Sequence, residues 1–175
     1  MTTLGFLYPG HAAEDDYPRM QAMLGDRAEL IVAHTYGQDL HAVRELLDLG
    51  SPHRLAQGAA QLRVHRPDAV LWACTSGSFV YGPEGAQRQL DALAEAAGVP
   101  ASSTSFAFLH AIKALGLHRV AIAASYPAEV AALFADFLAA GGIEVLGLSS
   151  AGITTAAAVG ALNEDEVISF PLEHD

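Results

Sequence analysis

The chain has 175 residues, and 51% of them are hydrophobic, so it is long enough for one ordinary domain or two small ones with a substantial core. Twenty acidic residues against nine Lys and Arg give a formal net charge of −11, which argues against a nucleic-acid backbone or an anionic membrane as partner. The single cysteine excludes an internal disulfide, and no apolar run reaches the roughly 20 residues that span a bilayer.

Strand-like and helical segments alternate from the start of the chain. Strands are predicted at residues 4–8, 29–34 and 68–73, and helices at residues 17–24, 41–65 and 83–97. The third strand is an almost continuous apolar run, which is typical of a central parallel strand buried on both faces. Gly50-Ser51-Pro52 is expected to divide the second helix in two.

The same alternation continues to the end of the chain. Strands are predicted at residues 99–102, 119–124 and 143–148, and helices at residues 106–115, 128–140 and 154–170, the last with a weak point at Gly160. Strands that alternate with helices predict an α/β fold of parallel sheets flanked by helices. The chain stops just after the last predicted helix, so we expect the second run of strands to be incomplete within these residues.

One thiol stands at the end of a predicted buried strand. In parallel sheets ligands bind beyond the carboxyl ends of the strands, and Cys74 directly follows the strand at 68–73. Thr75, Ser76 and Ser78 come next, and such hydroxyls with free backbone N–H groups are expected to lower the thiol pKa and to bind an anion. A small core cysteine, with hydroxyls that cap a helix or form a turn, is the alternative.

Two further segments after strands carry hydroxyl groups. Residues 102–105 (Ser-Ser-Thr-Ser) supply either carboxylate donors or a helix cap, and the cap is the favoured interpretation. Tyr126 follows the strand at 119–124, where its phenol is either a donor to a substrate carboxylate or an amphipathic residue at the rim.

The eight histidines show no spacing typical of metal ligands. His11 and His34 follow strands, but a surface or loop role is expected for each. The chain has no phosphate loop and no Gly-x-Gly-x-x-Gly fingerprint. We therefore expect neither a metal nor a cofactor.

Residues 68–79 (Asp-Ala-Val-Leu-Trp-Ala-Cys-Thr-Ser-Gly-Ser-Phe) resemble the first catalytic segment of the aspartate/glutamate racemase superfamily. Within it, the similarity is greatest to the branch of maleate cis-trans isomerases and arylmalonate decarboxylases. The similarity continues through residues 98–105, 114–121, 124–126 and 148–154.

The resemblance implies two pseudosymmetric α/β lobes with the active site between them and no cofactor or metal. The first lobe would span residues 1–112, and residues 113–175 would begin the second. Cys74 would be the nucleophile or the acid/base, and Thr75, Ser76 and Tyr126 would hold a substrate carboxylate. Tyr8 and Pro9 would lie in the first-strand loop that shapes the pocket.

Two features depart from the family pattern. The first-strand loop, residues 8–12 (Tyr-Pro-Gly-His-Ala), lacks the Asn that maleate isomerases carry there. The second catalytic segment of the family, which usually bears another cysteine, lies in a later strand than any in these residues.

The resemblance predicts a cofactor-independent isomerase, racemase or decarboxylase that uses Cys74 on a small carboxylate or dicarboxylate, such as maleate, an amino diacid or an arylmalonate. The alternative is a non-catalytic relative that binds a small carboxylate as an accessory or regulatory protein. We expect neither nucleic acid nor membrane as partner, and a homodimer is a candidate assembly. No basic segment precedes the first strand, so no signal peptide is indicated and a cytoplasmic location is expected.

Overall fold

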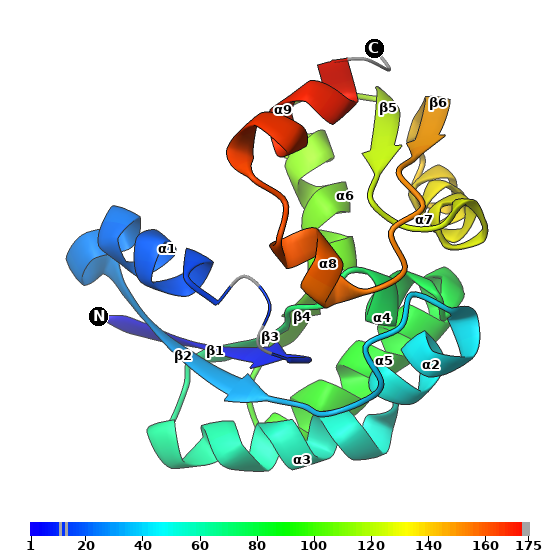
Figure 1. Cartoon of the computed structure of the whole chain (residues 1–175). Helices are drawn as coiled ribbons and strands as arrows, with labels where there is room; N and C mark the ends of the chain where they lie inside the picture. The colour runs from blue at the N-terminus through cyan, green and yellow to red at the C-terminus, as the bar shows by residue number, and fades with distance from the viewer. Residues whose placement is uncertain (11, 13, 173–175) are drawn as a thin grey trace.

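The computed structural model describes residues 1–10, 12 and 14–172, and its larger sheet has four parallel strands (Figure 1). In spatial order these are β2 (Ala28–His34), β1 (Thr2–Tyr8), β3 (Ala69–Trp72) and β4 (Ala101–Ser103). The register of the two middle strands pairs Leu7 with Trp72, so β1 and β3 end at the same edge. The predicted parallel sheet is confirmed, with Cys74 just beyond its carboxyl edge.

Within the described residues, six helices join or follow these strands. They are α1 (Asp16–Leu24), α2 (Val43–Leu49), α3 (Pro52–Leu62), α4 (Ser76–Phe79), α5 (Gly82–Ala97) and α6 (Thr104–Ala114). Short 3-10 turns occupy Gly25–Arg27 and Arg63–His65. Figure 1 shows α1 on one side of the sheet and α3 on the other, so apolar strands such as β1 are covered on both faces.

The predicted break at Gly50-Ser51-Pro52 is confirmed. Helix α2 ends at Leu49, and α3 begins at Pro52, where a proline has no N–H to leave unpaired. Helix α3 then packs closely on the sheet, because a Cβ on Gly58 would lie only 2.7 Å from a methyl group of Leu7.

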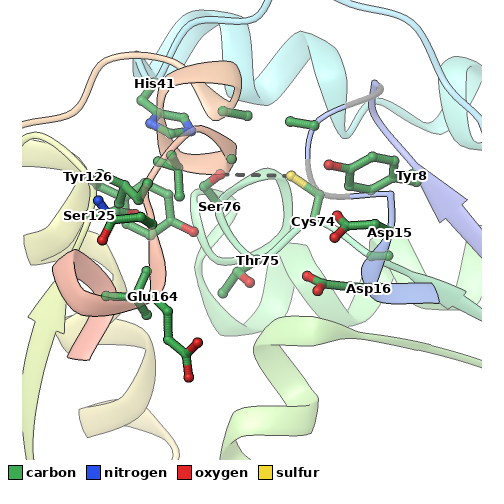
Figure 2. Close-up of a pocket in the computed structure, with 18 of the residues that line it drawn as sticks. Tyr8, Asp15, Asp16, His41, Cys74, Thr75, Ser76, Ser125, Tyr126 and Glu164 are labelled. Atoms are coloured by element: carbon green, nitrogen blue, oxygen red, sulfur yellow. Dashed lines mark hydrogen bonds between the residues drawn. The ribbon is translucent and has the colours of Figure 1, made fainter. Parts of the chain in front are cut away.

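A second, smaller sheet has two parallel strands, β5 (Arg119–Ala124) and β6 (Glu144–Ser150). Helix α7 (Ala128–Ala140) connects them, as the alternation of the sequence predicts. The carboxyl end of β5 leads to Ser125 and Tyr126, which face the carboxyl edge of the larger sheet (Figure 2).

The helix predicted at residues 154–170 is interrupted just beyond its predicted weak point at Gly160. The structure has α8 (Ala156–Gly160) and α9 (Glu164–Leu172) instead. The Asn163 carboxamide accepts from the Glu166 N–H at 3.0 Å, and the Glu166 carboxylate accepts from the Asn163 N–H at 2.8 Å. This reciprocal capping box starts a new helix at Glu164.

The two sheets share one hydrophobic core. Phe134 of α7 packs against Phe79 of α4, with ring centroids 5.1 Å apart, and Phe137 packs against Phe106 of α6 at 5.3 Å. This contact fixes the smaller sheet beside the loop that follows β3. In the part of the chain that the structure describes, no helix is long and apolar enough to cross a membrane.

Candidate active site

A pocket of about 870 Å³ lies between the carboxyl ends of the two sheets. Strand ends of the larger sheet contribute Tyr8, Cys74, Thr75 and Ser76, and the end of β5 contributes Tyr126 (Figure 2). Parallel strands bring their carboxyl ends to one edge, so residues far apart in the sequence meet there.

The Cys74 thiol lies where β3 gives way to α4 and is partly exposed in the pocket. The Gly77 N–H donates to its sulfur at 3.3 Å, and the Ser76 hydroxyl lies 3.8 Å from it. These donors favour the thiolate, but burial favours the neutral thiol and outweighs them, so the pKa of Cys74 is raised. The expectation of a lowered pKa was therefore wrong in its net direction, although the expected donors are present.

Three hydroxyl groups converge beside the thiol. Burial and the nearby Cys74 raise the pKa of Tyr126 to about 12, while hydrogen bonds with the hydroxyls of Ser76 and Thr75 act in the opposite direction. The phenol therefore keeps its proton at neutral pH and is available as a donor. The ring is held by edge-on contacts with Phe79 and His41, at centroid distances of 5.6 and 5.0 Å.

Tyr8 lies on the other side of Cys74, as Figure 2 shows. Burial and then the charge of Glu14 raise its pKa to about 12, so it too is a neutral phenol at ordinary pH. Its ring packs edge-on against Tyr17 at 5.7 Å. Pro9 is not among the residues that line the pocket, so of the two first-strand residues only Tyr8 reaches it.

The second hydroxyl cluster lies beneath the pocket and does not line it. The Ser103 hydroxyl caps α6 by accepting from the Phe106 N–H at 3.5 Å, which confirms the capping interpretation. The Ser105 hydroxyl donates to the Thr75 carbonyl at 2.7 Å. These residues support residues 74–77, which we call the site loop, from the side away from the pocket.

One histidine of the pocket was missed in the sequence. The His41 Nδ1–H donates to the Ile153 carbonyl at 2.9 Å. It follows β2 by several residues, and its position after a strand was the available signal. His34 instead pairs with Glu14, and His11 lies outside the described residues.

The apolar wall of the pocket was also missed, because it comes from the segment predicted as one helix. Helices α8 and α9 and their connection contribute apolar side chains, Val159, Leu162, Val167 and Ile168. The breaking of one helix into two lets both line the same cavity.

Acidic groups dominate the charged part of the lining. The carboxylates are those of Asp15, Asp16 and Glu164. Arg19 also lines the pocket, and its guanidinium pairs with Asp15 at 2.8 Å and lies 3.7 Å from Asp16. Among the described residues, no three His, Cys, Asp or Glu side chains are grouped in a way that could hold a metal ion.

Solved structures with the same fold come first. The maleate isomerase Iso from Pseudomonas putida S16, as a Cys-to-Ala variant with maleate, is 18% identical with a TM-score of 0.87, over 99% of this chain and 73% of that chain. The Nocardia farcinica maleate cis-trans isomerase, as a Cys-to-Ser mutant with a covalently bound succinylcysteine intermediate, is 19% identical with a TM-score of 0.87, over 99% and 73%. The fold is that of the aspartate/glutamate racemase superfamily.

A match of higher sequence identity and a family model show the family. A double mutant of arylmalonate decarboxylase in its liganded form is 25% identical with a TM-score of 0.86, over 99% of this chain and 72% of that chain. The arylmalonate decarboxylase family model matches residues 45–174, more than half of the chain. The chain belongs to the arylmalonate decarboxylase family. A search among curated protein sequences gives no significant match.

Proposed function

We propose that this chain catalyses cofactor-independent chemistry on a small carboxylate at Cys74, and that decarboxylation or racemisation through proton transfer is the reaction its site supports best. One observation carries the proposal: the thiol and the hydroxyls of Thr75, Ser76 and Tyr126 line the same pocket. A carboxylate needs several donors to offset its lost hydration, and neutral hydroxyls beside a thiol offer them.

The hydroxyls would act on the carboxylate that the product retains. When a geminal carboxylate leaves as CO2, the electron pair of the broken carbon–carbon bond stays on the α-carbon and spreads into the retained carboxylate as an enediolate. Donors already aimed at that group stabilise the developing charge without having to reorganise. Thr75, Ser76 and Tyr126 supply donors of this kind.

The thiol would then donate the proton that completes the reaction. Burial raises the pKa of Cys74, so at neutral pH the group holds a proton that it can transfer to the α-carbon. The thiolate that remains recovers a proton from solvent. A proton donor is thus better matched to this environment than a resting thiolate nucleophile.

The remaining walls support a substrate with one charged end. Apolar side chains of α8 and α9, such as Val159 and Ile168, suit an aryl or alkyl substituent. Arg19, the only Lys or Arg among the described residues that line the pocket, is engaged by two carboxylates. A second carboxylate held far from the hydroxyls would meet acidic groups there, so we favour arylmalonates over maleate.

Maleate cis-trans isomerisation is the second candidate. One matched isomerase carries a covalently bound succinylcysteine, so a cysteine thiol in that protein adds to a dicarboxylate. For this chain the same step would require the Cys74 thiolate.

A substrate screen tests the proposal. The purified protein is incubated in D2O with phenylmalonate, maleate, aspartate and glutamate. Products and loss of the α-proton signal are followed by proton NMR, and CO2 release is measured in parallel. Decarboxylation of the arylmalonate is the expected result, and formation of fumarate would favour the second candidate. Binding of a carboxylate by calorimetry without any turnover would contradict catalysis and support a non-catalytic carboxylate-binding relative.

A further inference from the structure

A buried amide beneath the site loop makes two hydrogen bonds to backbone carbonyls. Gln89, on α5, is 3% exposed. Its Nε2 donates to the Gly50 carbonyl at 2.7 Å and to the Gly77 carbonyl at 2.8 Å. Carbonyl oxygens only accept, so this arrangement fixes the orientation of the amide.

The other end of the same amide is left without a partner. Among the described residues, no group donates to the buried Gln89 Oε1. An unsatisfied buried acceptor is unfavourable, and an apolar side chain of similar length would avoid that penalty. The two donated bonds are therefore the feature that distinguishes glutamine from such a side chain at this position.

Gly77, which receives one of these bonds, is in direct contact with the reacting group. Its N–H donates to the Cys74 sulfur at 3.3 Å. A Cβ on Gly77 would lie 3.0 Å from that sulfur and 3.0 Å from the Trp72 ring, and a Cβ on Gly50 would lie 2.1 Å from the Gly77 carbonyl oxygen. Backbone, ring and thiol are packed so closely that movement of Gly77 would change the environment of the thiol.

A second anchor holds the preceding part of the loop. The Ser105 hydroxyl, fully buried on α6, donates to the Thr75 carbonyl at 2.7 Å. The segment from Thr75 to Gly77 is thus tied on both sides of Ser76 to α5 and α6, two helices that do not line the pocket.

We infer that Gln89 is a positioning residue of the site, which holds Gly77 so that its N–H faces the Cys74 sulfur. The inference rests on the proposed role of Cys74 as the reacting group. Gln89 touches neither the pocket nor the thiol, and it acts only through the Gly77 backbone.

The test is the rate of Cys74 alkylation by iodoacetamide as a function of pH, in the wild type and in Gln89→Met. Methionine keeps the length and volume of the side chain but donates no hydrogen bond. We expect the midpoint of the profile to move upward by about one pH unit, so alkylation below both midpoints slows about tenfold. Gln87→Met is the matched control, since Gln87 is exposed on the same helix and its amide donates to the Asp91 carboxylate at 2.9 Å.

A purely structural role of Gln89 predicts a different result. Thermal melting of Gln89→Met would then fall while the alkylation profile stayed at the wild-type midpoint, and this outcome, like a downward shift, would overturn the inference. If Gln89→Met does not fold, Ser105→Ala removes the second anchor and the same upward shift is required of it. The readout needs no substrate, so absence of turnover in the wild type would contradict the proposed function and leave this test intact.

Discussion

Two opposing influences act on the thiol of Cys74. The Gly77 N–H and the Ser76 hydroxyl favour its ionised form, whereas burial favours the neutral form and decides the net direction. Sequence reasoning located the donors correctly, because Thr, Ser and Gly follow the strand directly. It had no measure of burial, which depends on segments far away in the chain, such as those that bring Tyr8 and Tyr126 to the same pocket.

The raised pKa of Cys74 predicts a pH dependence for both reactivity and stability. Alkylation of the folded protein should reach its midpoint at a higher pH than alkylation of the urea-unfolded chain, where the thiol has its ordinary pKa of about 9. The unfolded chain then ionises first, so the free energy of unfolding is unaffected below that pKa and decreases as pH rises through it toward the folded value. A lower midpoint in the folded protein would contradict the account.

Removing the Tyr126 hydroxyl should weaken binding of a carboxylate without disturbing the fold. Tyr126→Phe keeps the ring contacts with Phe79 and His41 but removes one donor. A hydrogen bond to a charged group contributes about 1.5–3 kcal/mol, so Kd or KM should rise at least about tenfold. Tyr36→Phe, at an exposed tyrosine, is the matched control. Unchanged binding in Tyr126→Phe would remove the phenol from the proposed carboxylate site.

Strands and helices with a strong hydrophobic pattern could be predicted from the sequence. Short helices that begin with polar residues could not. The central strand β3 is predictable because a continuous apolar run is typical of a parallel strand that is buried on both faces of a sheet. Helix α4 spans only Ser76–Phe79, which is too short for any periodicity, so the sequence leaves a helix and a turn equally open there. The capping box of Asn163 and Glu166 marks the start of α9, whereas Gly160 alone indicates only a weak point within one helix.

Helix α8, which follows the smaller sheet, is held in place by the loop that follows β2 of the larger sheet. After β2, the Asp39 carboxylate accepts from the N–H groups of Ala156 and Ala157, at 2.7 and 3.0 Å. The His41 N–H donates to the Thr154 carbonyl at 2.7 Å. This loop therefore holds the first turn of a helix that lines the pocket through Val159.

Asp39→Ala should loosen α8. Loss of a helix cap costs about 1 kcal/mol, so we expect a modest fall in Tm and faster hydrogen exchange at residues 156–160. KM for a substrate with an apolar group should rise, because Val159 would no longer be held in place. Asp136→Ala, at an exposed position on α7, is the matched control. Exchange at 156–160 as slow as in the wild type would contradict this role for Asp39.

The net negative charge of the whole chain repels the anionic substrate that we propose for the site. A formal charge of −11 repels an anion at a distance, and only local donors favour it. Raising the salt concentration from about 10 mM to about 150 mM shortens the Debye length from about 30 Å to about 8 Å and should lower KM for a carboxylate roughly twofold. A neutral amide analogue used as a competitive inhibitor should show no such change, and a KM that rises with salt would contradict the argument.

The arrangement of the two sheets was predictable from the alternation of strands and helices together with the family resemblance. The resemblance also implies a site between the lobes, but the detailed lining of the pocket could not be predicted, because it depends on how Phe134 of α7 packs against Phe79 and so brings Tyr126 toward Cys74. The proposed division of the chain at residue 112 falls within α6 and, like the homodimer, stays a prediction.

Substitution of Cys74 by serine tests the central claim most directly. Serine keeps the shape of the side chain but holds its proton far more tightly, so a proton donor or nucleophile at this position would be lost. Turnover of the substrate found in the screen and thermal melting are measured together for the wild type and Cys74→Ser, with Ser169→Ala on α9 as the control. We predict that turnover of Cys74→Ser falls by about a hundredfold or more while Tm changes little. Full turnover with a lowered Tm would show that the thiol is a packing residue and would contradict the account.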